Sequence, residues 1–148
     1  IGASVGGYHA ESGATFIIGQ ATDEQMHILR TAVDTDTATV EALRPGATCL
    51  SVNEAALRVI QDAGYSDFIR HRIGHGMGIE GHEAPWLAPG DTTIVKPNMV
   101  FSCEPGIYRP GVDGCRTINS LIATEEGPAR VVSHFLRDNP PEKRVLQL

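Results

Sequence analysis

The chain has 148 residues, 41% of them hydrophobic and 20% charged, which is the composition of an ordinary globular domain with a real core. Its net charge of −6 argues against a nucleic-acid surface, and no apolar run approaches the length of a membrane span. Three irregularly spaced cysteines form neither a disulfide framework nor a metal clip, which favours a reducing compartment such as the cytoplasm.

Residues 1–20 are predicted to form a β-hairpin. Gly6-Gly7 is a turn signal, and Thr15 to Ile18 is a short β-branched and aromatic run. The chain opens without a methionine and enters this hairpin at once. We therefore expect the chain to be the larger part of a domain whose first portion precedes Ile1. We also expect its first strand to pair with that preceding segment.

Two helices are predicted next. The first begins at Thr22, where Gln25 completes a capping box, and it ends before Pro45-Gly46. The second runs from about Ser51 to Ala63, with a second capping box between Ser51 and Glu54. Apolar residues at helical spacing predict the core face of the first helix, namely Met26, Leu29, Val33, Val40 and Leu43.

Short apolar segments separated by Gly, Pro or Asp follow from Phe68 onward and are predicted to be strands. In the run from Met99 to Glu104 the side chains alternate, so that Ser102 and Glu104 share one face and Cys103 takes the other as a core thiol. Two helices followed by many strands predict an α+β domain with helices on one face of a curved antiparallel sheet. The tail, residues 137–148, is expected to be a surface extension.

The stretch from Gly74 to Glu83, GHGMGIEGHE, is the feature most indicative of function. It places His75 and His82 among four glycines, and glycine is costly in a strand unless the backbone must bend or allow a close approach. Glu104 ends a predicted strand downstream. A histidine and a glutamate at a concave site can act as general acid and base, or they can bind a divalent metal. The residue types alone leave both roles open.

These residues resemble a known family. GHGMGIEGHEAPWL followed by KPNMVFSCEPGIY is similar to the pita-bread fold hydrolases, which include Xaa-Pro aminopeptidase, Xaa-Pro dipeptidase (prolidase), methionine aminopeptidase and creatinase. GYHAESGATFIIGQATDEQ resembles the hairpin of that family and LRPGAT its inter-helix loop. The resemblance covers residues 1–135. It implies an incomplete, M24-type pita-bread catalytic domain, the carboxy-terminal domain of such proteins, over residues 1–148.

The resemblance further implies a two-metal peptidase site with two Asp, one His and two Glu as ligands. His75 matches the ligand histidine, Glu104 matches the first glutamate, and Glu11 stands where the second aspartate belongs. The first aspartate would fall just before Ile1, and Ile118 occupies the position of the last glutamate. Two metal ions need bridging carboxylates. We therefore expect no metal, or a single divalent ion (Mn, Zn, Co or Fe) on Glu11, His75 and Glu104.

The resulting hypothesis is a C–N bond hydrolase with a reduced or absent metal site. Its catalytic residues would be His75 as acid or base, His82 polarising the substrate carbonyl, and Glu104. Substrate would be bound by Glu11, His71 and Arg116. The alternatives are a metal-dependent Xaa-Pro aminopeptidase or dipeptidase and a non-catalytic pseudo-peptidase binding module. The expected partners are a small-molecule or dipeptide substrate, the preceding segment, and a second copy in a homodimer.

Overall fold

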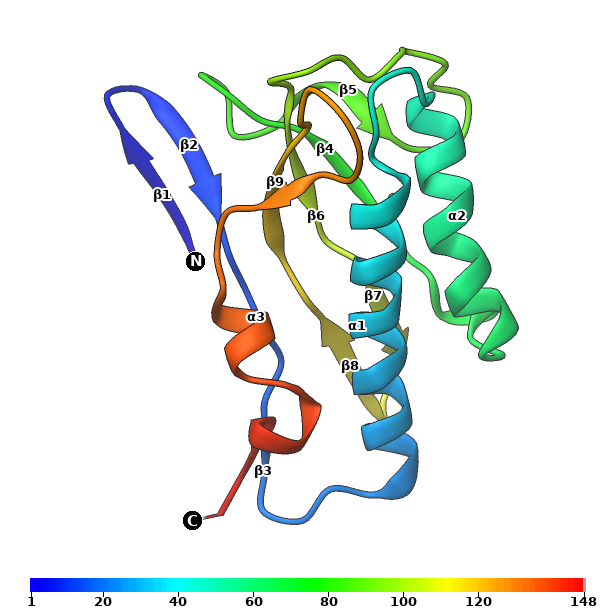
Figure 1. Ribbon diagram of the computed structural model, residues 1–148. Helices are drawn as coiled ribbons and strands as arrows, with labels where there is room; N and C mark the ends of the chain where they lie inside the picture. The colour runs from blue at the N-terminus through cyan, green and yellow to red at the C-terminus, as the bar shows by residue number, and fades with distance from the viewer. Residues whose placement is uncertain (148) are drawn as a thin grey trace.

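The computed structural model describes residues 1–147. Within that part, two long helices lie side by side and cover one face of an antiparallel sheet (Figure 1). They are α1 (Asp23–Ala42) and α2 (Cys49–Asp62). A hairpin of β1 (Gly2–Val5) and β2 (Tyr8–Glu11) stands away from the body of the molecule. It turns at Gly6-Gly7, both at positive φ, which confirms the predicted turn.

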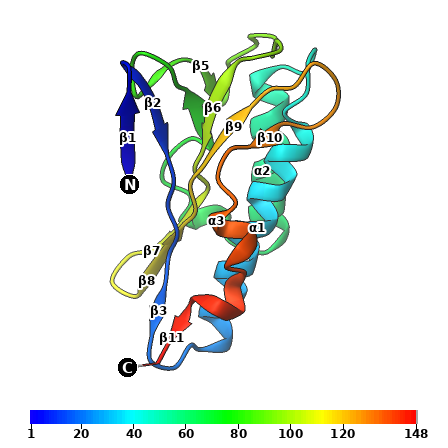
Figure 2. The ribbon, with the colours of Figure 1, turned by 60° about the vertical axis from the view of Figure 1, so that its left-hand side comes forward.

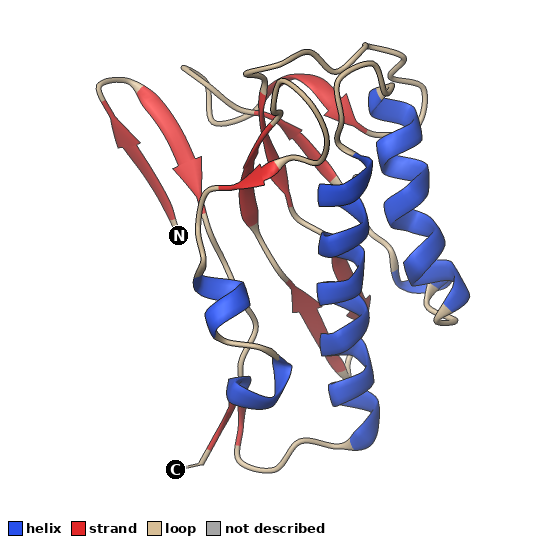
Figure 3. Ribbon diagram, viewed as in Figure 1, coloured by secondary structure: helices blue, strands red, loops and turns tan. Residues whose placement is uncertain are grey.

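The main sheet has the strand order β10-β9-β6-β4-β5, and each neighbouring pair is antiparallel. Its strands are β4 (Gly74–Gly76), β5 (Glu83–Leu87), β6 (Val100–Cys103), β9 (Asn119–Ile122) and β10 (Arg130–Val131). The helices lie on one side of this sheet and the β1–β2 hairpin on the other (Figures 2 and 3). This layering confirms the predicted α+β class.

Two smaller strand pairs extend the sheet region. β7 pairs antiparallel with β8, and β3 pairs in parallel with β11 near the end of the chain. Their bounds are β3 (Ile17–Ile18), β7 (Gly106–Arg109), β8 (Asp113–Arg116) and β11 (Val145–Leu146). A short 3₁₀ turn, η1 (Ser66–Phe68), links α2 to the strands. No helix within residues 1–147 is long and apolar enough to cross a membrane.

Helix α1 starts as predicted and buries most of the predicted stripe: Leu29 and Leu43 are buried, and Met26 and Val40 pack against the core. Thr22 and Gln25 form the expected capping box. Thr35 and Thr39 are buried, whereas Val33 of the predicted stripe is only half-buried. The two threonine hydroxyls donate to carbonyls four residues back in the helix, at 2.7 and 2.8 Å. A threonine that is satisfied in this way can face the core, and apolar periodicity does not detect it.

Helix α2 begins three residues earlier than predicted. Thr48, not Ser51, is the N-cap: its hydroxyl accepts from the Ser51 N–H at 3.0 Å, while the Ser51 hydroxyl donates back to the Thr48 carbonyl at 2.8 Å. Thr48 has an extended backbone because it forms a β-bridge with Ile94. That long-range bridge sets the start of the helix. Gly64, at φ +86°, takes the left-handed conformation that ends it.

The tail is also different from the expected surface extension. It forms a short helix, α3 (Phe135–Asp138), then a 3₁₀ turn, η2 (Pro141–Arg144), then β11 against β3. The Arg144 side chain is 0% exposed, and its guanidinium donates to the carbonyls of Asn139 at 2.6 Å and Leu136 at 3.2 Å. The arginine therefore satisfies carbonyls at the end of α3. The pairing of β11 with β3 and the Arg30–Glu142 ion pair connect the tail to the rest of the domain.

Candidate active site

Strand β4 carries His75 through the middle of the sheet. Its register pairs His75 with Ser102 of β6 and with Trp86 of β5. The glycines on either side let the neighbouring strands approach: a Cβ on Gly74 would lie 2.0 Å from the Ser102 carbonyl oxygen, and one on Gly76 would lie 2.7 Å from that of Ala84. The glycine-rich sequence is thus a packing requirement of the strand that presents His75.

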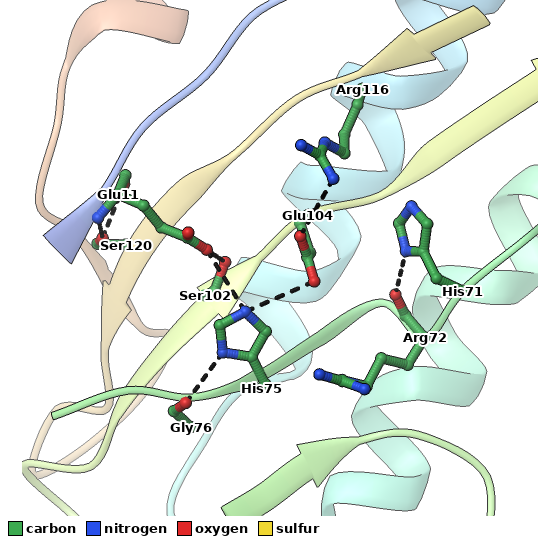
Figure 4. A network of polar contacts seen from close by, with 9 residues as sticks. All are labelled: Glu11, His71, Arg72, His75, Gly76, Ser102, Glu104, Arg116 and Ser120. Carbon is green, nitrogen blue, oxygen red and sulfur yellow. Dashed lines mark hydrogen bonds and ion pairs between the residues drawn. The ribbon is translucent and has the colours of Figure 1, made fainter. Parts of the chain in front are cut away.

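The His75 imidazole has one engaged nitrogen and one that faces two carboxylates. Nδ1 lies 2.9 Å from the Gly76 carbonyl, so Nδ1 carries the proton and donates it. Nε2 lies 3.5 Å from a carboxylate oxygen of Glu11 and 3.5 Å from one of Glu104 (Figure 4). The ring is 0% exposed, and no group in residues 1–147 forms a hydrogen bond of good geometry with Nε2. A proton or a metal ion fits at this atom.

Glu11 is held in place by two serines that face each other across β6 and β9. The Ser102 hydroxyl donates to the Glu11 carboxylate, while Ser120 accepts from the Glu11 N–H and donates to the Glu11 carbonyl (Figure 4). The contact with His75 lowers the pKa of Glu11 to about 2, and the bond from Ser102 adds to this against the effect of burial. The carboxylate therefore stays ionised.

His75 is shifted in the opposite direction. Burial by itself lowers its pKa, but the contact with Glu11, the bond to Gly76 and the charge of Glu104 together raise the pKa above 6.5. Glu104 in turn forms an ion pair with Arg116, at 3.7 Å, from the end of β8. The predicted residues Glu11, His75, Glu104 and Arg116 thus lie together (Figure 4). Glu11 comes from β2, His75 from β4, Glu104 from directly after β6, and Arg116 from the end of β8.

His82 joins this cluster at its exposed side. Its ring stacks on that of His75, with 4.0 Å between centroids and 27° between planes. A nitrogen of each histidine and an oxygen of Glu104 all lie within 4.8 Å of one another. His82 lies in the connection between β4 and β5. The sequence placed His82 at the same site as His75 and Glu104, as a group that contacts substrate; its distance from them also allows it to bind a metal.

His71 lies outside the cluster. Its Nδ1 lies 2.7 Å from the Arg72 carbonyl and its Nε2 lies 2.7 Å from the Tyr108 hydroxyl. Both ring nitrogens are therefore engaged by protein groups. The substrate-binding role predicted for His71 stays a prediction, and it would require one of these bonds to be exchanged.

Ile118 decides how many metal ions the site can hold. Its side chain is 8% exposed, its backbone exchanges two hydrogen bonds with Gly13, and a Cβ on Gly13 would lie 3.1 Å from the isoleucine side chain. An apolar, packed side chain offers no ligand to a second ion. One imidazole nitrogen and two carboxylates fit a single divalent ion in the described part of the chain, and they do not fit a pair.

Sequence reasoning missed the two serines. Ser102 had been placed on the same face as Glu104, and the structure confirms that placement, with Cys103 buried on the opposite face. The alternation gave the direction of the Ser102 side chain but not its partner. Glu11 reaches it from a hairpin 91 residues away in sequence. No local pattern indicates a contact of that range.

Comparison with known proteins shows which family the chain resembles. The profile of metallopeptidase family M24 matches residues 1–125. An Xaa-Pro dipeptidase of Lactobacillus delbrueckii subsp. lactis is 37% identical over 121 residues, which are 82% of this chain and 33% of that protein. An Xaa-Pro dipeptidase of Pyrococcus furiosus is 34% identical over 131 residues, which are 88% of this chain and 38% of that protein. The chain therefore spans about a third of the length of these curated relatives.

Solved structures give the same result. The crystal structure of dipeptidase PepE from Mycobacterium ulcerans superposes with a TM-score of 0.91 at 35% identity, over 100% of this chain and 39% of that one. The prolidase from Pyrococcus furiosus superposes with a TM-score of 0.85 at 34% identity, over 88% and 38%. The fold is the pita-bread fold, of which the described residues form a part. The chain belongs to metallopeptidase family M24.

Proposed function

We propose that the protein to which this chain belongs hydrolyses the C–N bond of dipeptides, with Xaa-Pro dipeptides as the first candidates, at a site that holds one divalent ion. The names of the relatives, Xaa-Pro dipeptidase and dipeptidase PepE, support the substrate class. The activity is a proposal because the chain spans only 33% and 38% of the two curated relatives.

The free nitrogen of His75 is the observation that carries this proposal. Nε2 is buried, lies 3.5 Å from both Glu11 and Glu104, and has its tautomer fixed by the Gly76 carbonyl. Histidine ligands of metal ions commonly donate their second N–H to a backbone carbonyl in this way. An ion held by these three residues would polarise a carbonyl and lower the pKa of a bound water.

The remaining groups have roles that follow from their positions. A cavity of about 280 Å³ opens at the cluster, between β1, β2 and the connection that carries His82; Glu11 and Met77 also line it. This volume is at the lower end for ligand pockets and favours a substrate of dipeptide size. His82, at the exposed side of the cluster, would contact the substrate. Arg116 would hold the Glu104 carboxylate in place through their ion pair.

Three further proposals concern the surroundings of the chain. We propose a cytoplasmic location, because Cys49, Cys103 and Cys115 are all buried free thiols. We propose that β1, whose residues are all exposed, pairs with a segment that precedes Ile1 in the full-length protein. We also propose a homodimer, as expected from the family resemblance.

The test is hydrolysis of an Xaa-Pro dipeptide and of a matched Xaa-Ala dipeptide by the full-length protein, after chelation and after return of Zn²⁺ or Mn²⁺. We expect cleavage that requires the returned ion and is abolished in His75→Ala. The His27→Ala variant, which changes an exposed histidine on α1, should cleave normally. Hydrolysis that is equally fast without any ion would contradict the one-ion site.

A second candidate function is a non-catalytic dipeptide-binding protein. Ile118 favours it, because it removes a carboxylate from the site implied by the family resemblance. The same assay separates the two candidates. Saturable dipeptide binding without turnover, with each metal present, would support the binding protein and exclude the hydrolase.

A further inference from the structure

We propose that His82 is a direct ligand of the single ion, so that the centre is built on His75, His82 and Glu104, with Glu11 as a fourth, more weakly bound carboxylate. This inference rests on the proposed function only in taking the cluster as a metal site. It changes the role of His82 from a group that contacts substrate to one that binds metal. It also predicts which metals the site prefers.

Distances support His82 as a ligand. One donor atom from each of His75, His82 and Glu104 lies within 4.8 Å of the others. Ligand atoms around an ion with bonds of about 2.0–2.2 Å lie roughly 3–3.5 Å apart. The cluster thus needs to contract by about 1 Å. His82 is the residue free to move, because its side chain is exposed and Gly81 precedes it, while His75 is fully buried.

The two rings also have complementary constraints. His75 is fixed by its bond to the Gly76 carbonyl and by its position within β4. His82 stacks on it, with 4.0 Å between ring centroids and 27° between ring planes, and its exposed side chain is free to reorient beside the cluster. A ring already positioned over its neighbour gives up little conformational freedom when it binds an ion beside that neighbour.

Glu11 is the weaker ligand for two reasons. Its carboxylate already accepts a hydrogen bond from the Ser102 hydroxyl, which competes with an ion for the same oxygen. Its backbone N–H and carbonyl are both bonded to Ser120 of β9, which restricts how far Glu11 can shift toward the ion. With Ile118 supplying no oxygen, a second imidazole would replace the missing donor without adding negative charge.

The donor set determines the metal preference. Two imidazoles and one carboxylate form the set found in zinc hydrolases and in non-haem iron(II) centres. Imidazole suits Zn²⁺, Fe²⁺ and Co²⁺, whereas carboxylate-rich sites suit Mn²⁺ and Mg²⁺. We therefore expect the chain to bind Zn²⁺ and Co²⁺ more tightly than Mn²⁺ by a wider margin than a one-histidine site would show.

The experiment is a Co²⁺ titration of the purified chain followed by visible absorption, with Zn²⁺ and Mn²⁺ affinities from competition. We expect His82→Ala and His75→Ala each to weaken Co²⁺ binding by at least about 100-fold, the upper end of the loss seen when even an outer-sphere partner is removed. His27→Ala is the matched control and should bind as the wild type does. Thermal melting of each variant confirms that it is folded.

The outcomes separate this inference from the proposed function. If His82→Ala binds Co²⁺ as tightly as the wild type while His75→Ala does not, His82 is not a ligand, and the one-ion site still stands. If the wild type fails to bind Co²⁺ and Zn²⁺, both the ligand assignment and the one-ion site are wrong. If His82→Ala binds Co²⁺ more weakly but has the same ratio of Zn²⁺ to Mn²⁺ affinity as the wild type, the inferred donor set is wrong.

Discussion

One nitrogen of His75 faces two carboxylates from different segments. Glu11 and Glu104 both lie 3.5 Å from it, in a site where the imidazole is fully buried. Carboxylates that face one buried imidazole nitrogen are stabilised by positive charge between or beside them. Arg116 offsets part of the charge of Glu104 from one side. A cation at Nε2, either a proton or a metal ion, would offset the charge of Glu11.

The isoleucine at position 118 gives a direct test of this charge balance. Ile118→Glu should lower the free energy of unfolding of the metal-free chain by about 2–3 kcal/mol, because it buries another carboxylate without a partner. Urea denaturation at pH 7, with and without Zn²⁺, measures this, and Ile118→Val should lose no more than about 1.5 kcal/mol. A metal-free Ile118→Glu chain as stable as the wild type would contradict the prediction.

The Arg109–Asp113 ion pair gives a pH-dependent prediction at the same scale. The bidentate contact, at 2.7 and 2.5 Å, holds the pKa of Asp113 below 3.8. A lowered folded pKa stabilises the protein above the ordinary value, and that contribution is lost as the pH falls through the lowered pKa. Asp113→Asn should therefore cost about 1 kcal/mol at pH 7 and progressively less as the pH falls below 3.8.

Urea unfolding at pH 7 and at pH 3 checks the Asp113 prediction. Asp62→Asn removes an exposed carboxylate at the end of α2 and serves as the control, with little change expected at either pH. If Asp113→Asn lowers the free energy of unfolding by the same amount at both pH values, packing and not charge is the cause.

At the scale of elements, local chemistry predicted the start of α1 and failed for α2. The Thr22–Gln25 capping box is a contact within one helical turn, so the sequence is sufficient to identify it. The start of α2 depends on the bridge between Thr48 and Ile94, which are 46 positions apart by number. The Ser51 signal was chemically reasonable, but Ser51 bonds back to the true cap instead.

The two cap candidates of α2 can be compared directly. Thr48→Ala should lower the free energy of unfolding by about 1 kcal/mol, because it removes the acceptor for the Ser51 N–H. Ser51→Ala should cost clearly less, since its hydroxyl only returns a bond to the Thr48 carbonyl. Chemical denaturation of both variants measures the difference. A larger loss in Ser51→Ala would mean that Ser51 is the cap after all.

At the scale of the whole molecule, the sequence predicted the layers and the active-site histidine but not the contacts that close the domain. The paired motifs around His75 and Glu104 carry enough glycine and alternation to be interpreted locally. The docking of the tail through the pairing of β11 with β3, and the reach of Glu11 to Ser102, join segments that are distant in sequence. Such contacts depend on the assembled fold, so only the structure identifies them.

The assembled core also determines cysteine reactivity. Burial raises the pKa of Cys49 and Cys115 to about 11 and that of Cys103 well above its usual value. The thiolate is the reactive form, so the native chain should not react with a thiol reagent at pH 8. All three thiols should react once the chain is unfolded in guanidinium. Rapid labelling of any one of them in the native chain would contradict the described core.

The number of metal ions per chain tests the account most directly. Elemental analysis of the purified chain, dialysed after saturation with Zn²⁺, should give one ion per chain for the wild type and none for His75→Ala. Loss of the ion in His75→Ala would show that the ion binds at the cluster of Glu11, His75 and Glu104. Two ions per wild-type chain would mean that Ile118 does not limit the site, and zero would mean that a proton alone occupies Nε2.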